Sequence, residues 1–109
     1  VINVSSRAAH RGSDKDHLAY AAAKAGLLGL TRGIAAAYAD DGVLAYAVAP
    51  GWVETGFAPP APGRGRTDFP LGEPTTAADV AEVIAFLATC RTRHITGATI
   101  DITGADYIR

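Results

Sequence analysis

The chain has 109 residues, of which 49% are hydrophobic and 19% charged, and its formal net charge is -1. This size allows one domain, and the hydrophobic content argues against disorder. The near-neutral charge gives no electrostatic reason to expect nucleic acid or a membrane surface as a partner, and no apolar stretch is long enough to span a bilayer. With a single cysteine and no Cys/His cluster of zinc-site spacing, we expect no disulfide framework and no metal site. A soluble cytoplasmic protein is the expectation.

The first half of the chain predicts a strand and a long helix. Residues 1–5 (VINVS) are apolar and β-rich, and a polar, glycine-containing loop follows to about residue 16. His10 and His17 lie in this loop, where we expect them to be solvated. Residues 18–38 are rich in alanine and leucine and contain no proline; apolar side chains recur there at helical spacing, at Leu27, Leu30, Ile34 and Tyr38.

The second half predicts a strand, a loop, a helix and a last strand. The apolar run 43–49 suits a strand buried on both faces. Residues 52–74 hold five of the six prolines and predict a long loop, which is a lid or binding loop or else disordered. Thr76 and Asp79 resemble a capping box at the start of the second helix, and 98–102 predict the final strand.

This order of elements predicts an α/β fold, with strand-helix-strand units joined by right-handed crossovers in a parallel sheet. We expect residues 1–109 to form one partial domain. Because the chain has no methionine and opens directly on a strand, we expect it to be part of something longer.

The sharpest chemical pattern is Tyr20-Ala-Ala-Ala-Lys24 near the start of the long helix. A spacing of four places both side chains on one helix face, about one turn apart. A free phenol has a pKa of about 10, and a nearby ammonium favours the phenolate, so the pair suits general acid/base catalysis. The alternative interpretation is a half-buried tyrosine beside a solvated lysine.

Other polar and glycine positions follow the predicted strands at their carboxyl ends. Ser6 comes after the first strand, and its hydroxyl suits a hydrogen bond to a substrate carbonyl oxygen. Pro50-Gly51 ends the second strand, followed by Val53 and Thr55, which offer an amide and a hydroxyl to a ligand. Ligands of α/β sheets bind at the carboxyl ends of the strands, so we expect these features to share one edge.

These motifs closely resemble the C-terminal half of the short-chain dehydrogenase/reductase family. The resemblance covers essentially all 109 residues and is nearest to reductases of 3-oxoacyl thioesters and to related sugar and alcohol dehydrogenases. Its segments, in chain order, are Ile2-Asn-Val-Ser-Ser6, Tyr20-Ala-Ala-Ala-Lys24-Ala-Gly26, Val48-Ala-Pro-Gly-Trp-Val-Glu-Thr55, Asp79-Val-Ala81, Phe86-Leu-Ala88, Ile95-Thr-Gly97 and Asp101-Ile-Thr-Gly-Ala105.

The resemblance implies a Rossmann-like, doubly wound parallel sheet and an NAD- or NADP-dependent oxidoreductase that interconverts a ketone and a secondary alcohol. Tyr20 would be the general acid/base, Lys24 would support it and bind the nicotinamide ribose, and Ser6 would orient the carbonyl. Four further residues would lie along the nicotinamide end of the cofactor: Pro50, Gly51, Val53 and Thr55. Residues 52–74 would be the substrate lid, with Trp52 as a wall of the substrate pocket. The intact protein would be a homo-oligomer.

Residues 1–109 depart from the family pattern in what they lack. They contain neither the glycine-rich turn that holds the cofactor pyrophosphate nor the residue that separates NAD from NADP, and the family's catalytic asparagine is also missing. Tyr46 stands where relatives often have asparagine. The alternative function is therefore a truncated, non-catalytic fragment that acts at most as an oligomerisation or interaction module.

Overall fold

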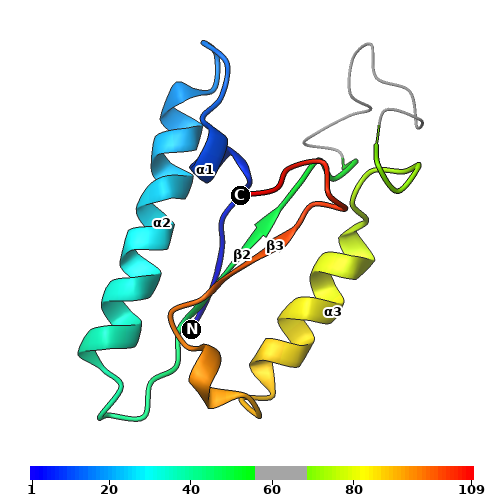
Figure 1. Cartoon of the computed structure of the whole chain (residues 1–109). Coiled ribbons are helices and arrows are strands. Elements are labelled where there is room, and N and C mark those ends of the chain that lie inside the picture. Colours follow the sequence, from blue (N-terminus) through cyan, green and yellow to red (C-terminus); the bar gives the residue numbers. More distant parts are fainter. Residues whose placement is uncertain (56–68) are drawn as a thin grey trace.

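The computed structural model describes residues 1–55 and 69–109. Within them, three parallel strands form one sheet in the order β1-β2-β3: β1 (Ile2–Val4), β2 (Tyr46–Pro50) and β3 (Thr99–Ile102) (Figure 1). Ile2 pairs with Tyr46, and Ala47 pairs with Thr99. The predicted α/β fold with a parallel sheet is confirmed, and each strand is shorter than the sequence pattern indicated.

Among the described residues, two long helices flank the sheet. Helix α2 (Leu18–Ala37) matches the predicted first helix, and α3 (Ala77–Ala88) matches the second. The predicted cap of α3 is present, since the Thr76 hydroxyl accepts a hydrogen bond from the Asp79 amide at 3.1 Å. Two short elements were not predicted: α1 (Ala8–Arg11), inside the expected loop, and the 3-10 helix η2 (Arg93–Ile95).

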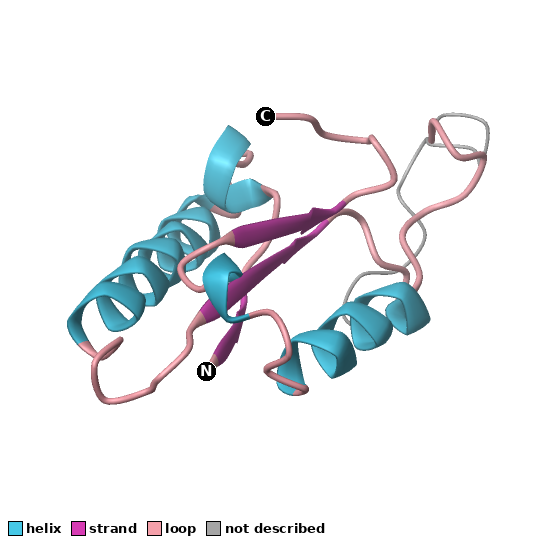
Figure 2. Ribbon diagram, turned by 60° about the horizontal axis from the view of Figure 1, so that its bottom comes forward, coloured by secondary structure: helices cyan, strands magenta, loops and turns pink. Residues whose placement is uncertain are grey.

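The two faces of the sheet have different compositions. On the α3 face, Tyr46 and Val48 are buried against Leu87 and form the centre of the hydrophobic core. On the α2 face the alternate positions of the same strand are alanines, and the buried α2 residues are mostly small. Asn3 of β1 donates a hydrogen bond from Nδ2 to Thr31 Oγ1 of α2 at 2.9 Å. Helices α2 and α3 therefore cover opposite faces (Figure 2).

This placement corrects the expected handedness. The strands lie side by side in chain order, so both crossovers move across the sheet in the same direction. With their helices on opposite faces, the two units have opposite hands, although about 98% of such units are right-handed. The connection 51–76 between β2 and α3 is much longer than an ordinary strand-to-helix loop, which frees α3 to cover the other face.

The predicted loop 52–74 is described only in part. Val53 forms a parallel bridge with Thr75, and Gly72 takes a positive φ of 75° in a turn before α3. The interpretation of this loop as a substrate lid falls mainly on residues 56–68, which lie outside the described residues.

Candidate active site

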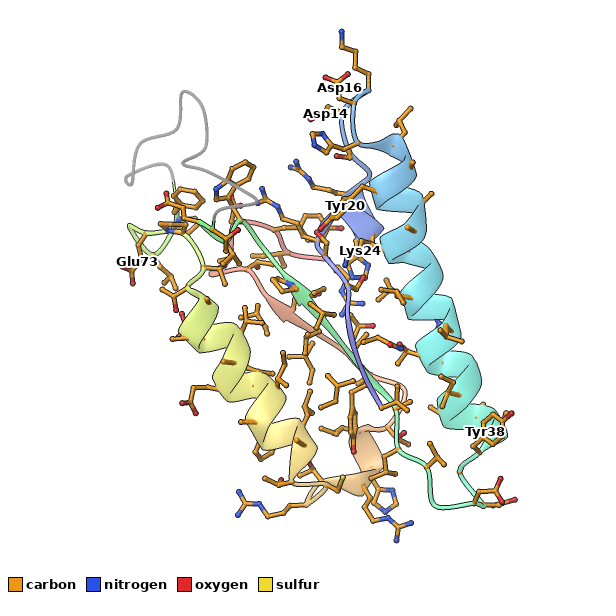
Figure 3. All side chains as sticks on the ribbon, turned by 180° about the vertical axis from the view of Figure 1, so that it is seen from behind. Asp14, Asp16, Tyr20, Lys24, Tyr38 and Glu73 are labelled. Atoms are coloured by element: carbon orange, nitrogen blue, oxygen red, sulfur yellow. The ribbon has the colours of Figure 1, made fainter. Side chains whose placement is uncertain are left out.

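The candidate site lies at the edge of the sheet where all three strands end. Because the strands are parallel, their carboxyl ends meet there. Helix α2 runs back along the sheet, so its first turn begins at the same edge. Figure 3 shows Tyr20 and Lys24 projecting from this end of α2 toward the strands.

Tyr20 and Lys24 form a close pair tied to the end of β1. The Lys24 ammonium lies over the Tyr20 ring, with Nζ 5.6 Å from the ring centroid, and donates a hydrogen bond to the Val4 carbonyl at 2.9 Å. The Ser5 hydroxyl donates to the Lys24 carbonyl at 2.7 Å, which fixes the helix to the strand end. Tyr20 is 36% exposed, so this residue is partly accessible from solvent. The sequence-predicted pair is thus brought together at an open edge.

Ser6 lies between β1 and the end of β2. The Ser5 amide donates to the Val48 carbonyl at 2.7 Å, and the Arg7 amide donates to the Pro50 carbonyl at 3.0 Å, so the backbone is held on both sides of Ser6. Ser6 Oγ accepts a hydrogen bond from the Ala8 amide at 3.2 Å. An hydroxyl that accepts in this way still has its own hydrogen to donate.

Gly51 has a packing reason to be glycine. A Cβ at this position would lie 3.0 Å from Thr103 Cα and 3.2 Å from Thr75 Oγ1. The Gly51 amide donates to the Ile102 carbonyl at 2.9 Å, and Thr75 Oγ1 donates to the same carbonyl at 3.1 Å. Close approach of β2, β3 and the segment before α3 thus accounts for this glycine without any ligand.

The remaining predicted positions lie at the end of β2 or beyond it. Pro50 is buried and Thr55 is exposed, while Trp52 and Val53 are half-buried. The bridge between Val53 and Thr75 leads this segment toward α3. The structure therefore places Pro50 and Gly51 beside Ser6, whereas Trp52, Val53 and Thr55 lie progressively farther along the edge. The Trp52 Nε1 atom is shielded from solvent and has no hydrogen-bond partner among the described residues.

A polar cluster that the sequence did not predict joins α1 to the C-terminal segment 103–109. Arg7 forms an ion pair with Asp106, and both side chains are more than nine-tenths buried. The His10 ring stacks on Tyr107 with centroids 6.1 Å apart, so the expectation of a solvated His10 is wrong. His17, by contrast, is exposed as predicted. Almost the whole chain separates the partners in sequence, and no local pattern signals their contact.

One pair of exposed side chains precedes α2. His17 Nδ1 lies 2.7 Å from Asp14 Oδ1. The hydrogen bond to Asp14 raises the pKa of His17 above its usual value of 6.5, and the same bond lowers the pKa of Asp14 below 3.8. His17 occupies the N-cap position of α2, so this pair lies one turn before Tyr20.

Two other features are missing from the described part of the chain. Among residues 1–55 and 69–109, no three acidic, histidine or cysteine side chains are grouped as metal ligands would be. No helix in the same ranges has both the length and the hydropathy to cross a membrane.

Comparison with known proteins identifies the family. The family described as enoyl-(acyl carrier protein) reductase matches residues 1–104. The 3-oxoacyl-(acyl-carrier-protein) reductase of Pseudomonas aeruginosa is 38% identical over 93 residues, covering 82% of this chain and 38% of its own length. The chain spans less than half the length of this and other curated relatives that it matches.

Solved structures show the same likeness. The 3-ketoacyl-(acyl-carrier-protein) reductase of Brucella melitensis, complexed with NADH, superposes with a TM-score of 0.84 at 29% identity, over 98% of this chain and 44% of that one. A blue fluorescent protein from a metagenomic library, in complex with NADPH, has a TM-score of 0.81 at 34% identity, over 94% and 43%. The chain belongs to the short-chain dehydrogenase/reductase family.

Proposed function

We propose that this chain carries the proton-transfer part of an NAD(P)-dependent oxidoreductase that interconverts a ketone and a secondary alcohol. The observation that carries the proposal is the Tyr20–Lys24 pair, held one turn apart at the carboxyl edge of the sheet, with the ammonium 5.6 Å from the phenol ring. A pair of this kind at such an edge is suited to moving a proton to or from a bound ligand.

Each residue has a distinct role in the proposed reduction. The Tyr20 hydroxyl donates its proton to the carbonyl oxygen of the substrate, which becomes the alcohol. Lys24 stabilises the phenolate that remains, because its positive charge lies close to the ring. The Ser6 hydroxyl, whose oxygen already accepts from Ala8, donates its hydrogen to the same carbonyl oxygen and orients it. In the reverse direction Tyr20 removes the proton of the alcohol.

The residues at this edge fit the nicotinamide end of a dinucleotide. Lys24 uses one ammonium hydrogen on the Val4 carbonyl, which leaves two for ribose hydroxyls. Tyr20 lies beside it, and four positions continue along the edge: Pro50, Gly51, Val53 and Thr55. When bound, the reduced nicotinamide supplies the hydride. The NADH and NADPH named for the two similar structures support this cofactor class.

We further propose that the chain is the C-terminal half of this enzyme. Residues 1–109 contain no Gly-x-x-x-Gly-x-Gly turn, and the matched relatives are more than twice as long. The pyrophosphate and adenosine sites would then lie in a segment upstream of Val1. Reading the coding sequence upstream tests this directly: a glycine-rich strand-turn-helix is expected, and its absence would favour the non-catalytic module as the function.

The proposal also concerns the class of substrate. The matching family carries the description enoyl-(acyl carrier protein) reductase. The Pseudomonas relative and the Brucella structure are instead named as 3-oxoacyl and 3-ketoacyl reductases. We favour the carbonyl substrate, because Tyr20 and Ser6 provide a proton donor and a hydrogen-bond donor for one oxygen. Assays with a 3-oxoacyl and an enoyl thioester side by side would separate the two.

The central experiment is Tyr20→Phe, assayed by consumption of the reduced cofactor in the full-length protein. We expect turnover to fall about 10²- to 10⁴-fold, the usual contribution of general acid catalysis. Tyr38→Phe is the matched control, since Tyr38 follows the other end of α2 and is 51% exposed (Figure 3). Near-normal turnover of Tyr20→Phe would exclude the proposed proton transfer.

A further inference from the structure

The backbone around Ser6 is continuous with α1, and α1 is held from one side by the C-terminal segment 103–109. Arg7 follows Ser6 directly and is the N-cap residue of α1. Its amide donates to the Pro50 carbonyl, so this residue links Ser6 to the end of β2. Figure 1 shows the C-terminal end of the chain lying beside α1. Whatever fixes Arg7 therefore limits where the Ser6 hydroxyl can point.

The side chain of Arg7 is fixed by a buried ion pair. Arg7 pairs with Asp106, and their side chains are only 9% and 8% exposed. The free-energy cost of removing two charges from water is offset only while the two charges stay paired. The ion pair therefore fixes the position of α1 relative to the C-terminal segment. The hydrophobic core around Tyr46 and Leu87 contains neither residue. The pair thus lies apart from the packing that stabilises the sheet.

Further contacts fix the C-terminal segment itself. The Thr103 hydroxyl donates to the Tyr107 carbonyl at 2.8 Å, which closes a turn around Asp106. Tyr107 stacks on His10 of α1. At the end of the segment, Arg109 Nε donates to Asp101 Oδ2 at 2.7 Å and anchors the chain to β3. Asp106 is therefore presented to Arg7 by a segment that is tied at both ends.

We infer that Arg7 is a positioning residue for Ser6, and that Asp106, from the other end of the chain, holds it in place. This inference rests on the proposed function, because it assigns the pair to the residue that orients the substrate carbonyl. Neither side chain touches the substrate. Their effect reaches the reaction through the Ser6 hydroxyl and the Ala8 amide that donates to it.

A double-mutant cycle between Asp106→Asn and Ser6→Ala tests the inference in the full-length protein. We expect Asp106→Asn to lower kcat about 10- to 100-fold, the range expected for a misplaced reacting group. In the Ser6→Ala background the same change should lower kcat less than about twofold, because the group that it positions is gone. Equal losses in both backgrounds, or no loss in either, would overturn the inference. Asp41→Asn, exposed at the opposite end of the sheet, is the matched control.

A second variant covers the case in which Asp106→Asn does not fold. Replacing both partners by apolar residues, Arg7→Met with Asp106→Leu, removes the charges together, and such replacements are often tolerated in stability. We expect a folded protein with faster amide hydrogen exchange at Arg7 and Ala8 and the same loss of kcat. Full turnover with unchanged exchange would overturn the inference. A Tyr20→Phe protein with near-normal turnover would instead remove the proposed function, whatever the cycle shows.

Discussion

Replacing Gly51 by alanine separates a packing requirement from a ligand requirement at the edge of the sheet. The added Cβ would lie 3.0 Å from Thr103 Cα and 3.2 Å from Thr75 Oγ1. The first contact is with backbone, so β3 must shift or the end of β2 must bend. Overpacking of this kind costs about 1–3 kcal/mol. We therefore expect Gly51→Ala to lower the free energy of unfolding by that amount, with or without cofactor.

Gly26→Ala on α2 is the matched control, with the opposite expected sign. A Cβ there meets nothing within 4 Å, and the position is exposed in the middle of a helix. Alanine is favoured over glycine in a helix by about 1 kcal/mol, so this variant should be more stable than the parent chain. Urea unfolding followed by circular dichroism should place the two variants about 2–4 kcal/mol apart. Equal stabilities would refute the assignment of Gly51 to packing and leave a ligand as its explanation.

Other positions carry three further predictions. Cys90 has a φ of 55° just after α3, a conformation that suits glycine, so Cys90→Gly should stabilise the protein by about 1 kcal/mol and raise its Tm. Because pairing with Asp14 raises the pKa of His17, the stabilisation from this pair is fully present below pH 6.5, while Asp14 is ionised, and is lost as the pH rises through the raised pKa. Asp14→Asn should return the pKa of His17 toward 6.5, as measured by NMR titration. Finally, the 109-residue chain alone should bind NADH or NADPH poorly, and tight binding measured by calorimetry would contradict the assignment of the pyrophosphate site to an upstream segment.

The family resemblance implies a homo-oligomer, which stays a prediction. The outer face of α2 offers a way to test it. Gly26, Gly29 and Gly33 leave open space on this face, and Leu30 is 53% exposed. If this face contacts a second copy, Leu30→Glu should shift the full-length protein toward monomers, measured by light scattering. An unchanged mass would locate any assembly elsewhere.

Local patterns predicted the two long helices and the Tyr20–Lys24 pair because both depend on short spacings. A separation of four on a helix fixes which side chains share a face, and the sequence therefore places Tyr20 and Lys24 together before any fold is known. The cap formed by Thr76 and Asp79 is equally local. The strand ends were predicted less well, because a strand ends where its backbone pairing ends, and the apolar run 43–49 begins before that pairing does.

The polar cluster could not be predicted because its partners meet only through the tertiary fold. Arg7 and Asp106 come from opposite ends of the chain, and neither lies in a motif that signals burial. The expectation of a solvated His10 is wrong for the same reason, since its neighbour Tyr107 belongs to the last few residues. The handedness of the second crossover depended likewise on which face α3 covers, and helical periodicity specifies a buried side of the helix without specifying the face of the sheet.

The two faces of the sheet contribute differently: the α3 face holds the hydrophobic core, and the α2 face positions the proposed site. The α3 face holds the large buried side chains Tyr46, Val48 and Leu87. Truncation of a buried leucine to alanine lowers the free energy of unfolding by about 2–5 kcal/mol. The α2 face is lined by alanines and by hydrogen bonds such as that from Asn3 to Thr31, which allow the helix to lie close to the strands. That close approach lets Lys24 reach the Val4 carbonyl while remaining over the Tyr20 ring. A bulkier α2 face would move the helix outward and separate the proposed proton donor from the strand ends. The small residues of this face therefore matter for the proposed reaction, even though they contribute little to the core.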